Sequence, residues 1–190
     1  MKLLNFEFKA RLNNESRVRE ALKRLKARYI GTDHQIDTYF RVPSGRLKVR
    51  EGRLENALIF YRRDNLRRAR KSAVELMLLP RRNSLRAILA NSLGTLAVVN
   101  KRREIYFVKN VKIHLDRVRR LGRFLEVEAI SRTGDVKKTR SQARQFQGIF
   151  GITANDIVAE SYSDLILAKN LKSTEVTGGG EVPNVQIRKH

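Results

Sequence analysis

Two periodicities alternate along the chain, one typical of strands and the other typical of helices. In the first segment Asn5, Glu7, Lys9 and Arg11 alternate with apolar or small residues, so a strand would place them on one face. Segments with the same period recur along the chain. They predict strands at residues 3–12, 35–42, 46–51, 56–63, 72–79, 96–109, 111–118 and 123–130.

Apolar residues at helical spacing predict a few helices between and after these strands. The expected helices lie at residues 15–29, 83–91 and 135–150, and a short last helix holds Tyr162, Leu165 and Ile166. Asn13 or Asn14 is placed to cap the first helix, while Gly31 and Gly151 are placed to end the first and third. The residues expected on the buried sides are Val18, Ala21, Leu22 and Leu25, then Leu85, Ile88 and Leu89, and finally Val136, Ala143, Phe146, Ile149 and Phe150.

About eight strands and a few helices, without an internal repeat or a convincing linker, indicate one domain of the α+β class. The architecture we expect is an antiparallel eight-stranded β-barrel, closed or nearly closed, with flanking helices. This domain should span residues 1–170. Residues 171–190 contain Gly178-Gly179-Gly180 and lack periodicity, so we expect a disordered tail there.

The predicted strands share an unusual feature, because one face carries charges of both signs while the other is apolar. The polar positions in phase on their strands are Glu7, Lys9, Arg11, Lys48, Arg50, Lys101, Arg103, His114, Asp116, Glu126 and Glu128. For a single strand, a polar face turned to water is the simpler interpretation. Taken together, the strands favour a barrel with a charged lumen and an outside partly covered by helices. Because unpaired charges in a lumen are costly, such a lumen is expected to bind a ligand.

The mixture of charges indicates what this lumen would hold. Basic residues from several strands would surround phosphate oxygens, Arg with forked donors and Lys as a point charge. Carboxylates would repel a polyanion unless a divalent cation lies between them and the phosphates. Glu126 and Glu128, together with Glu7 and Asp116, supply oxygen ligands suited to Mg²⁺ or Mn²⁺.

Several motifs, in a fixed order along these strands, resemble one known family. They are Asn5-Phe6-Glu7-Phe8-Lys9, Leu47-Lys48-Val49-Arg50, Tyr61-Arg62-Arg63-Asp64, Lys101-Arg102-Arg103, Ile113-His114-Leu115-Asp116 and Leu121-Gly122-Arg123-Phe124-Leu125-Glu126-Val127-Glu128. Over about residues 3–168 the chain resembles the CYTH domain family of triphosphate tunnel metalloenzymes. That group includes class IV adenylate cyclases, thiamine triphosphatases and inorganic tripolyphosphatases, and the cyclase branch is the most similar.

The resemblance implies a triphosphate tunnel and a role for individual residues. The ligands of Mg²⁺ or Mn²⁺ would be Glu7, Glu126, Glu128 and Asp116. The phosphate-binding residues would be Lys9, Arg11, Lys48, Arg50, Arg62, Lys101 and Arg103. The catalytic residues would be Lys9, Arg62 and Asp116. Asn5 departs from the family's ExExK motif, whose first glutamate it replaces. An amide brings an oxygen ligand but no negative charge, so one metal site is expected to be weaker.

By this resemblance the chain is expected to be a metal-dependent enzyme that binds ATP or another triphosphate. Conversion of ATP to cyclic AMP and pyrophosphate is the first expectation, and hydrolysis of thiamine triphosphate or inorganic triphosphate is the alternative. A non-catalytic binder of triphosphates or polyphosphate is a further alternative, motivated by Asn5 and by the positive charge of the chain.

The composition adds a strong charge and excludes other classes. Lys and Arg number 41 against 19 acidic residues, which gives a net charge of +22 and indicates a solvated basic surface or an anionic partner. Basic runs at residues 67–71, 117–120 and 137–140 are compatible with nucleic-acid binding. That function is not favoured, because aromatic residues make up 7% of the chain and do not interleave with the runs.

The absence of cysteine excludes disulfides, zinc–thiolate sites and cysteine nucleophiles. We expect no secretory leader, because charged residues follow Met1 too soon for the apolar region of such a leader, and the sequence contains no apolar run of membrane-spanning length. We therefore expect a cytoplasmic protein without a membrane partner. The sequence does not fix the oligomeric state, and a homodimer is compatible with it.

Overall fold

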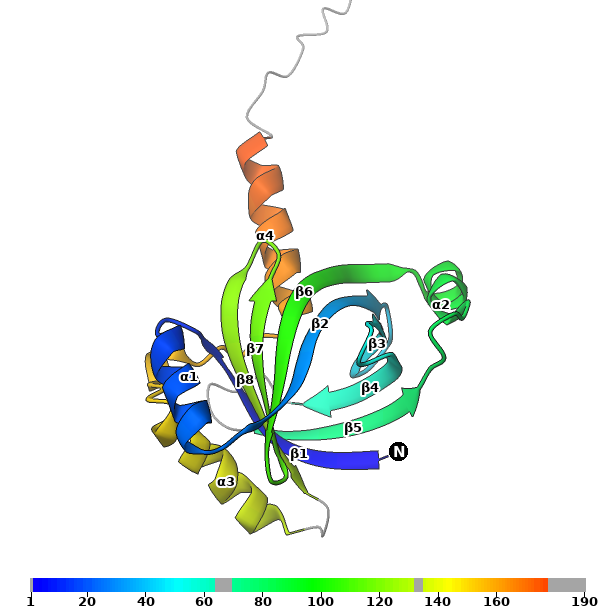
Figure 1. Ribbon diagram of the computed structural model, residues 1–190. Coiled ribbons are helices and arrows are strands. Elements are labelled where there is room, and N and C mark those ends of the chain that lie inside the picture. Colours follow the sequence, from blue (N-terminus) through cyan, green and yellow to red (C-terminus); the bar gives the residue numbers. More distant parts are fainter. Residues whose placement is uncertain (1, 64–69, 132–134, 178–190) are drawn as a thin grey trace, which may run out of the picture.

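The computed structural model describes residues 2–63, 70–131 and 135–177, and within them eight antiparallel strands form a closed barrel (Figure 1). The strands are β1 (Lys2–Arg11), β2 (Arg28–Phe40), β3 (Arg46–Glu51), β4 (Ala57–Arg63), β5 (Arg70–Leu78), β6 (Thr95–Val108), β7 (Val111–Val118) and β8 (Gly122–Ser131). They follow the order β1-β5-β4-β3-β2-β6-β7-β8, and β8 pairs with β1 to close the ring. The predicted eight-stranded antiparallel barrel is confirmed.

The main hydrophobic core lies outside the barrel, under two helices on one side of it (Figure 1). These helices are α1 (Glu15–Arg24) and α3 (Val136–Ile149). Phe8 of β1 and Val127 of β8 pack there with Val18 of α1 and Phe146 of α3. Because alternate residues of a strand point to opposite faces, the polar residues between these apolar ones point into the barrel.

The register of the strands brings those inward residues into rows. Glu7 of β1 lies opposite Glu128 of β8, and Lys9 lies opposite Glu126. The inward side chains of β1 and β8 therefore lie next to one another. The alternation of polar and apolar residues decides which face is the lumen, and the register decides which lumenal residues are neighbours.

A last helix, α4 (Tyr162–Thr177), packs into one end of the barrel. Tyr162 and Ile166 belong to a second apolar cluster that contains the inward residues Val118 and Phe124. The rings of Phe124 and Tyr162 meet edge to face, with their centroids 5.0 Å apart. The first turns of α4 therefore contribute side chains to the inside of the barrel, while the rest of the helix extends away from it (Figure 1).

The first helix is shorter than its periodicity predicted. Asn14 caps it as expected, accepting a hydrogen bond from the Arg17 backbone N–H, but the helix ends at Arg24. Lys26 then takes a left-handed conformation with φ of 49°, and the chain enters β2 at Arg28. The prediction that Gly31 ends this helix was wrong, because pairing with β6 takes residues 28–31 into the sheet.

The second helix, α2 (Leu85–Leu93), buries only part of the face that was predicted. None of its residues is fully buried; Leu85 and Leu89 are partly buried, whereas Ile88 is 58% exposed, so the inward-facing assignment of Ile88 was wrong. The helix connects β5 to β6 and lies to one side of the barrel (Figure 1). In α3, Ala143 and Phe146 are buried as predicted.

Two further expectations concern the ends of elements. Val136, expected on the buried side of α3, is 40% exposed at the first position of that helix. Helix α4 continues to Thr177, so the boundary expected at residue 171 falls inside a helix. Residues 178–190 lie outside the described part of the chain, and the division into a domain and a tail remains a prediction. Across the described ranges, no helix combines the length and apolar character needed to cross a bilayer.

Candidate active site in the barrel lumen

A cavity of about 230 Å³ lies in the lumen and brings together most of the predicted site residues. Eight of those residues line it, namely Glu7, Lys9, Lys48, Arg50, Lys101, Arg103, Glu126 and Glu128. They come from β1, β3, β6 and β8, so the charged wall depends on closure of the barrel. The roles that the resemblance assigns to these residues remain proposals, but their meeting in one cavity is a property of the fold.

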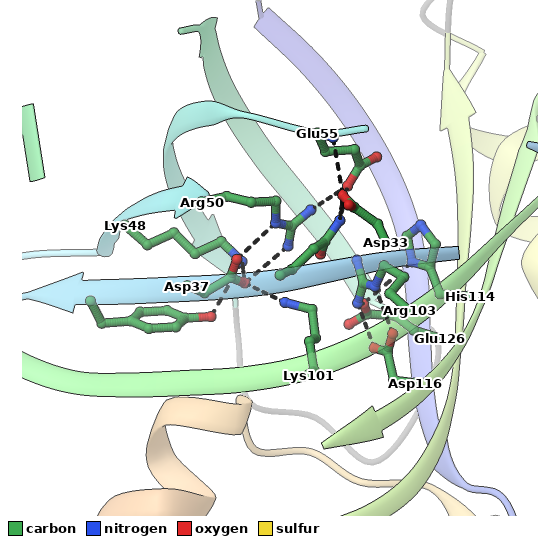
Figure 2. Close-up of polar contacts among 12 residues, drawn as sticks. Asp33, Asp37, Lys48, Arg50, Glu55, Lys101, Arg103, His114, Asp116 and Glu126 are labelled. Atoms are coloured by element: carbon green, nitrogen blue, oxygen red, sulfur yellow. Dashed lines mark hydrogen bonds and ion pairs between the residues drawn. The ribbon is translucent and has the colours of Figure 1, made fainter. Parts of the chain in front are cut away.

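Asp37 of β2 is the centre of the first cluster of charges (Figure 2). Its Oδ2 accepts hydrogen bonds from Lys48 Nζ at 2.8 Å, Lys101 Nζ at 2.7 Å and Arg50 Nη2 at 3.0 Å. Arg50 Nε also donates to Asp37 Oδ1, at 2.8 Å. Three cationic side chains therefore converge on a single carboxylate that is only 1% exposed.

Burial and these contacts shift the pKa values in the cluster. Burial alone would raise the pKa of Asp37. The positive charges of Arg50, Lys101 and Lys48 lower it by more, so the pKa of Asp37 lies well below its usual range. Burial, together with repulsion from Arg50 and Arg103, lowers the pKa of Lys101 to about 7, although the negative charge of Asp37 acts to raise it. An anionic ligand beside Lys101 would favour its charged form.

Arg103 of β6 is the centre of the second cluster (Figure 2). Its Nη2 donates to Asp116 Oδ2 at 2.5 Å and to Glu126 Oε2 at 2.7 Å, and its Nε donates to Asp116 Oδ1 at 2.6 Å. The Tyr162 hydroxyl of α4 donates to Asp116 Oδ2 at 2.7 Å. Lys9 Nζ lies 3.4 Å from Glu126 Oε1 and 3.9 Å from the centre of the Tyr162 ring. Helix α4 is thereby connected to the charged wall.

A group of possible metal ligands lies beside this second cluster. One ligand atom each from His114, Glu126 and Glu128 lies within 4.8 Å of the others. Burial lowers the pKa of His114 to about 3, so its imidazole is neutral. Among the described residues neither ring nitrogen of His114 has a hydrogen-bond partner, and Nδ1 lies 3.6 Å from Glu126 Oε2. Burial raises the pKa of Glu128 to about 7. A neutral imidazole and two carboxylates are a donor set that a divalent cation accepts, so these residues fit a metal.

Asp116 is placed differently from the other predicted metal ligands. It does not line the cavity, and both of its carboxylate oxygens are bound by Arg103 or Tyr162. Asp116 is in phase with His114 and Lys112 on β7, and it lies directly opposite Arg103 of β6. Asp116 is therefore placed to orient Arg103, and its carboxylate does not face the cavity.

Two predicted phosphate-binding residues are not brought into the lumen. Arg62 is exposed on the outer face of β4, with its guanidinium 5.3 Å from the centre of the Phe60 ring. Tyr61, the residue before it, points inward instead. Arg11 has the phase of the lumen but lies past its end, where Nη1 donates to the Leu121 carbonyl at 2.6 Å. The structure therefore does not support a catalytic or binding role for Arg62, and it separates Arg11 from the cavity.

Several charged residues of the lumen were missed at the level of sequence. They are Asp37, Glu55, Arg70 and Lys112. Asp37 and Lys112 had a signal, because Asp33, Gln35, Asp37 and Tyr39 alternate on β2 and Lys112 is in phase with His114 on β7. Arg70 is 2% exposed, with Nε 3.6 Å from Glu7 Oε1, and it lies between the predicted strands 56–63 and 72–79. Glu55, in the connection between β3 and β4, binds Arg50 and Lys112 and follows no period.

The wall formed by β4 and β5 is apolar, in contrast to the rest of the cavity. The residues that line it there are Ala57, Ile59, Tyr61, Val74, Leu76 and Leu78. Asn5 of β1 lies at the border between the two walls, opposite Ser72 of β5. The side-chain oxygens Oδ1 of Asn5 and Oγ of Ser72 are both buried and have no hydrogen-bond partner in the part of the chain that the structure describes. The lumen thus has a charged side, an apolar side and a pair of neutral polar groups at one border.

Comparison with known proteins agrees with this architecture. The family model for the CYTH domain matches residues 3–162, and the chain belongs to the CYTH domain family. It is 26% identical over 174 residues to the Methanocaldococcus jannaschii protein named "Putative adenylate cyclase MJ0240", a match that covers 86% of this chain and 98% of that relative.

Solved structures share the fold. The PH1012 protein from Pyrococcus horikoshii OT3 superimposes with a TM-score of 0.70 at 24% identity, over 85% of this chain and 98% of that one. A Vibrio parahaemolyticus protein whose structure is titled "a putative adenylate cyclase" gives a TM-score of 0.69 at 17% identity, over 86% of this chain and 98% of that one. At these identities the likeness concerns the barrel alone.

Proposed function

We propose that this protein is a metal-dependent enzyme that binds a triphosphate in the barrel lumen and converts ATP to cyclic AMP and pyrophosphate. The observation that carries the proposal is the convergence of Lys48, Arg50 and Lys101 in a cavity that also holds Glu126 and Glu128. The name of the Methanocaldococcus jannaschii relative, which the match covers almost completely, supports the cyclase in particular.

The cations around Asp37 are the proposed phosphate site. Lys48, Arg50 and Lys101 already donate to carboxylate oxygens at 2.7–3.0 Å, and phosphate oxygens accept the same charge-assisted hydrogen bonds. A bound phosphate would therefore compete with Asp37 for these donors. Lys9 of β1 and Arg103 of β6 also reach the cavity and would bind the phosphates nearer to Glu126.

The carboxylates on β8 are the proposed metal ligands. A divalent cation held by Glu126 and Glu128, with Glu7 and neutral His114 beside them, would neutralise phosphate oxygens and lower the pKa of an attacking hydroxyl. In the proposed reaction the 3′-hydroxyl oxygen of ATP attacks the α-phosphorus, the bond from that phosphorus to the β-phosphate oxygen breaks, and the hydroxyl proton is released. Lys9 and Arg103 would stabilise the charge that develops on the pyrophosphate.

The apolar wall favours an organic triphosphate over an inorganic one. Ile59, Val74 and Leu76 offer hydrophobic surface within the same cavity as the phosphate-binding cations, and an inorganic chain has no apolar group to bury there. A base or another heterocycle placed against this wall would remove that surface from water. This contact supports ATP or thiamine triphosphate rather than tripolyphosphate as the substrate.

A non-catalytic triphosphate-binding protein is the second candidate, and two observations favour it. Asn5 supplies no charge at the position of a family glutamate, and Glu126 is already engaged by Arg103 and Lys9. Both features reduce the negative charge available to a metal. In such a protein the lumen would bind the same ligands without turning them over.

Product analysis tests the proposal directly. Purified protein is incubated with ATP, thiamine triphosphate and tripolyphosphate, each with Mg²⁺ and with Mn²⁺, and the products are separated by chromatography. Cyclic AMP with pyrophosphate is the expected result, and its loss in Lys9→Ala is expected because Lys9 points into the lumen. Orthophosphate release would instead make the protein a triphosphatase, and tight binding without products would make it a binder. Full turnover by Lys9→Ala would refute the lumen as the active site.

A further inference from the structure

The charged lumen does not account for the net charge of the chain. Among the described residues, seven acidic and seven basic side chains are buried or line the lumenal cavity. The acidic ones are Glu7, Asp33, Asp37, Glu55, Asp116, Glu126 and Glu128, and the basic ones are Lys9, Lys48, Arg50, Arg70, Lys101, Arg103 and Lys112. These charges balance, so the excess of +22 lies outside the lumen.

A row of arginines crosses the outer face of three neighbouring strands. Arg102 of β6 lies directly opposite Arg117 of β7, and Arg117 lies directly opposite Arg123 of β8. All three side chains are exposed. Side chains opposite one another on adjacent strands have Cβ atoms about 4.5–5.5 Å apart, and like charges in such pairs are destabilising. We call Arg102, Arg117 and Arg123 the arginine row.

The arginine row begins where the helical cover of the barrel ends. The adjacent outward residues Leu115 of β7 and Leu125 of β8 lie opposite one another and are buried in the core under α1 and α3. Arg19 of α1 and the arginine row line the same surface hollow, of about 130 Å³. The barrel therefore presents a concave basic surface rather than isolated charged side chains.

Acidic residues neutralise only part of this surface. Glu15 pairs with Arg123 at 2.9 Å and with Arg19 at 2.6 Å, and Glu104 pairs with Arg19 at 2.8 Å. In residues 2–63, 70–131 and 135–177, neither Arg102 nor Arg117 forms an ion pair with an acidic side chain. Two neighbouring guanidinium groups thus face solvent side by side, in a geometry that an anionic partner would stabilise.

An aromatic pair lies on the same face of the sheet. Tyr29 of β2 and Tyr106 of β6 are opposite one another, with ring centroids 5.0 Å apart. Tyr29 is 52% exposed, and Arg19 Nη1 donates to the Tyr106 hydroxyl at 3.3 Å. Arg19 thereby connects the aromatic pair to the hollow of the arginine row. Arginines for phosphates and an exposed ring for a base are the components of single-strand recognition.

We propose that this outer surface binds single-stranded nucleic acid, with phosphates on the arginine row and a base stacked on Tyr29. The inference does not depend on the function of the lumen. From the sequence, nucleic-acid binding was not favoured because aromatic residues do not interleave with the basic runs. The fold, however, places Tyr29 on the same face of the sheet as Arg117. Inorganic polyphosphate would use the arginines without Tyr29, and an anionic membrane would need no stacking surface, so nucleic acid explains the two features together.

The test measures binding of a fluorescently labelled single-stranded RNA 12-mer by anisotropy at several salt concentrations. The double variant Arg102→Glu/Arg117→Glu is compared with Arg140→Glu/Arg144→Glu, which makes the same change in charge on the exposed face of α3. We expect the first variant to weaken binding at least tenfold and to reduce the slope of log affinity against log salt by about 1.4, since each phosphate contact contributes about 0.7. The control should weaken binding less than threefold.

Two further measurements identify the ligand and guard against misfolding. Tyr29→Ala should weaken RNA binding about tenfold, as expected for the loss of one stacked base, and should leave binding of long-chain inorganic polyphosphate unchanged. Arg117→Ala, which introduces no new charge, should weaken binding in the same direction as the double variant. Equal losses in the α3 control, tighter binding of polyphosphate or of anionic vesicles than of RNA, or no effect of Tyr29→Ala would each overturn the proposal.

Discussion

Removal of the Asp37 carboxylate tests the assignment of the phosphate site most informatively. In Asp37→Asn the side chain keeps its size but loses its charge, and Lys48, Arg50 and Lys101 lose their shared counter-ion. Breaking a buried ion pair from one side costs about 3–5 kcal/mol. Lys101 can relieve part of this cost by releasing its proton, because its pKa is already lowered to about 7, so we expect the lower end, about 3 kcal/mol.

This loss is large enough to be measured and can be reversed by a ligand. For a chain of this size, about 1 kcal/mol shifts the midpoint of thermal unfolding by about 2–4 °C, so Asp37→Asn should unfold about 6–12 °C lower. Tripolyphosphate at a hundredfold excess over its dissociation constant should stabilise the wild type by about 2.7 kcal/mol. It should stabilise Asp37→Asn more, because the ligand no longer competes with Asp37 and replaces the missing negative charge.

The assay is thermal unfolding of both proteins with and without tripolyphosphate, in the absence of metal. Asp33→Asn is the matched control, since Asp33 is also 1% exposed on β2 but accepts hydrogen bonds from the backbone N–H groups of Arg53 and Glu55. That variant should be destabilised without extra stabilisation by the ligand. A ligand-induced shift in Asp37→Asn no larger than in the wild type would refute the reasoning.

Three other predictions address the remaining parts of the lumen. Lys101→Arg should remove the part of the pH dependence of tripolyphosphate binding that comes from Lys101. With a pKa of about 7, Lys101 loses its charge between pH 6 and pH 8.5, so in calorimetric titrations the wild-type affinity should fall relative to that of the variant over this range. A ratio of the two affinities that does not change with pH would contradict this. Glu126→Gln should weaken Mn²⁺ binding by more than about 100-fold, beyond the usual effect of outer-shell partners, while metal-free binding of tripolyphosphate persists. Asn5→Glu should raise metal affinity and metal-dependent turnover, because it adds a carboxylate beside Glu7; unchanged values in both assays would show that position 5 does not reach the metal.

The fold and most of the charged wall could be predicted from the sequence because alternation along a strand is a local signal. Glu7 and Lys9 on β1, like Glu126 and Glu128 on β8, are two positions apart, and that spacing alone places each pair on a common face. The same signal failed on β4. Its sequence, Ala57 to Arg63, has no polar alternation before Arg62, so the inward phase was decided by packing of Ile59 and Tyr61 against the second apolar cluster.

Contacts between distant segments could not be predicted in this way. Tyr162 lies 46 residues after Asp116 in the chain, and its hydroxyl donates to Asp116 Oδ2. This hydrogen bond occupies an oxygen that a metal ligand would need. Glu55 lies in a connection without a period, and its contact with Lys112 depends on closure of the barrel. The start of β2 was assigned to a helix that Gly31 was expected to end, whereas pairing with β6 takes residues 28–31 into the sheet.

The central claim is that the lumen binds a triphosphate, and a calorimetric titration of tripolyphosphate into the metal-free protein tests it most directly. The account predicts one bound molecule per chain, and an affinity that Lys48→Ala lowers by about tenfold to a hundredfold, since a hydrogen bond to a charged group contributes about 1.5–3 kcal/mol. The double variant Arg102→Glu/Arg117→Glu should keep this binding, because it alters only the outer surface. Absence of binding, or an affinity that depends on the outer arginines but not on Lys48, would contradict the account.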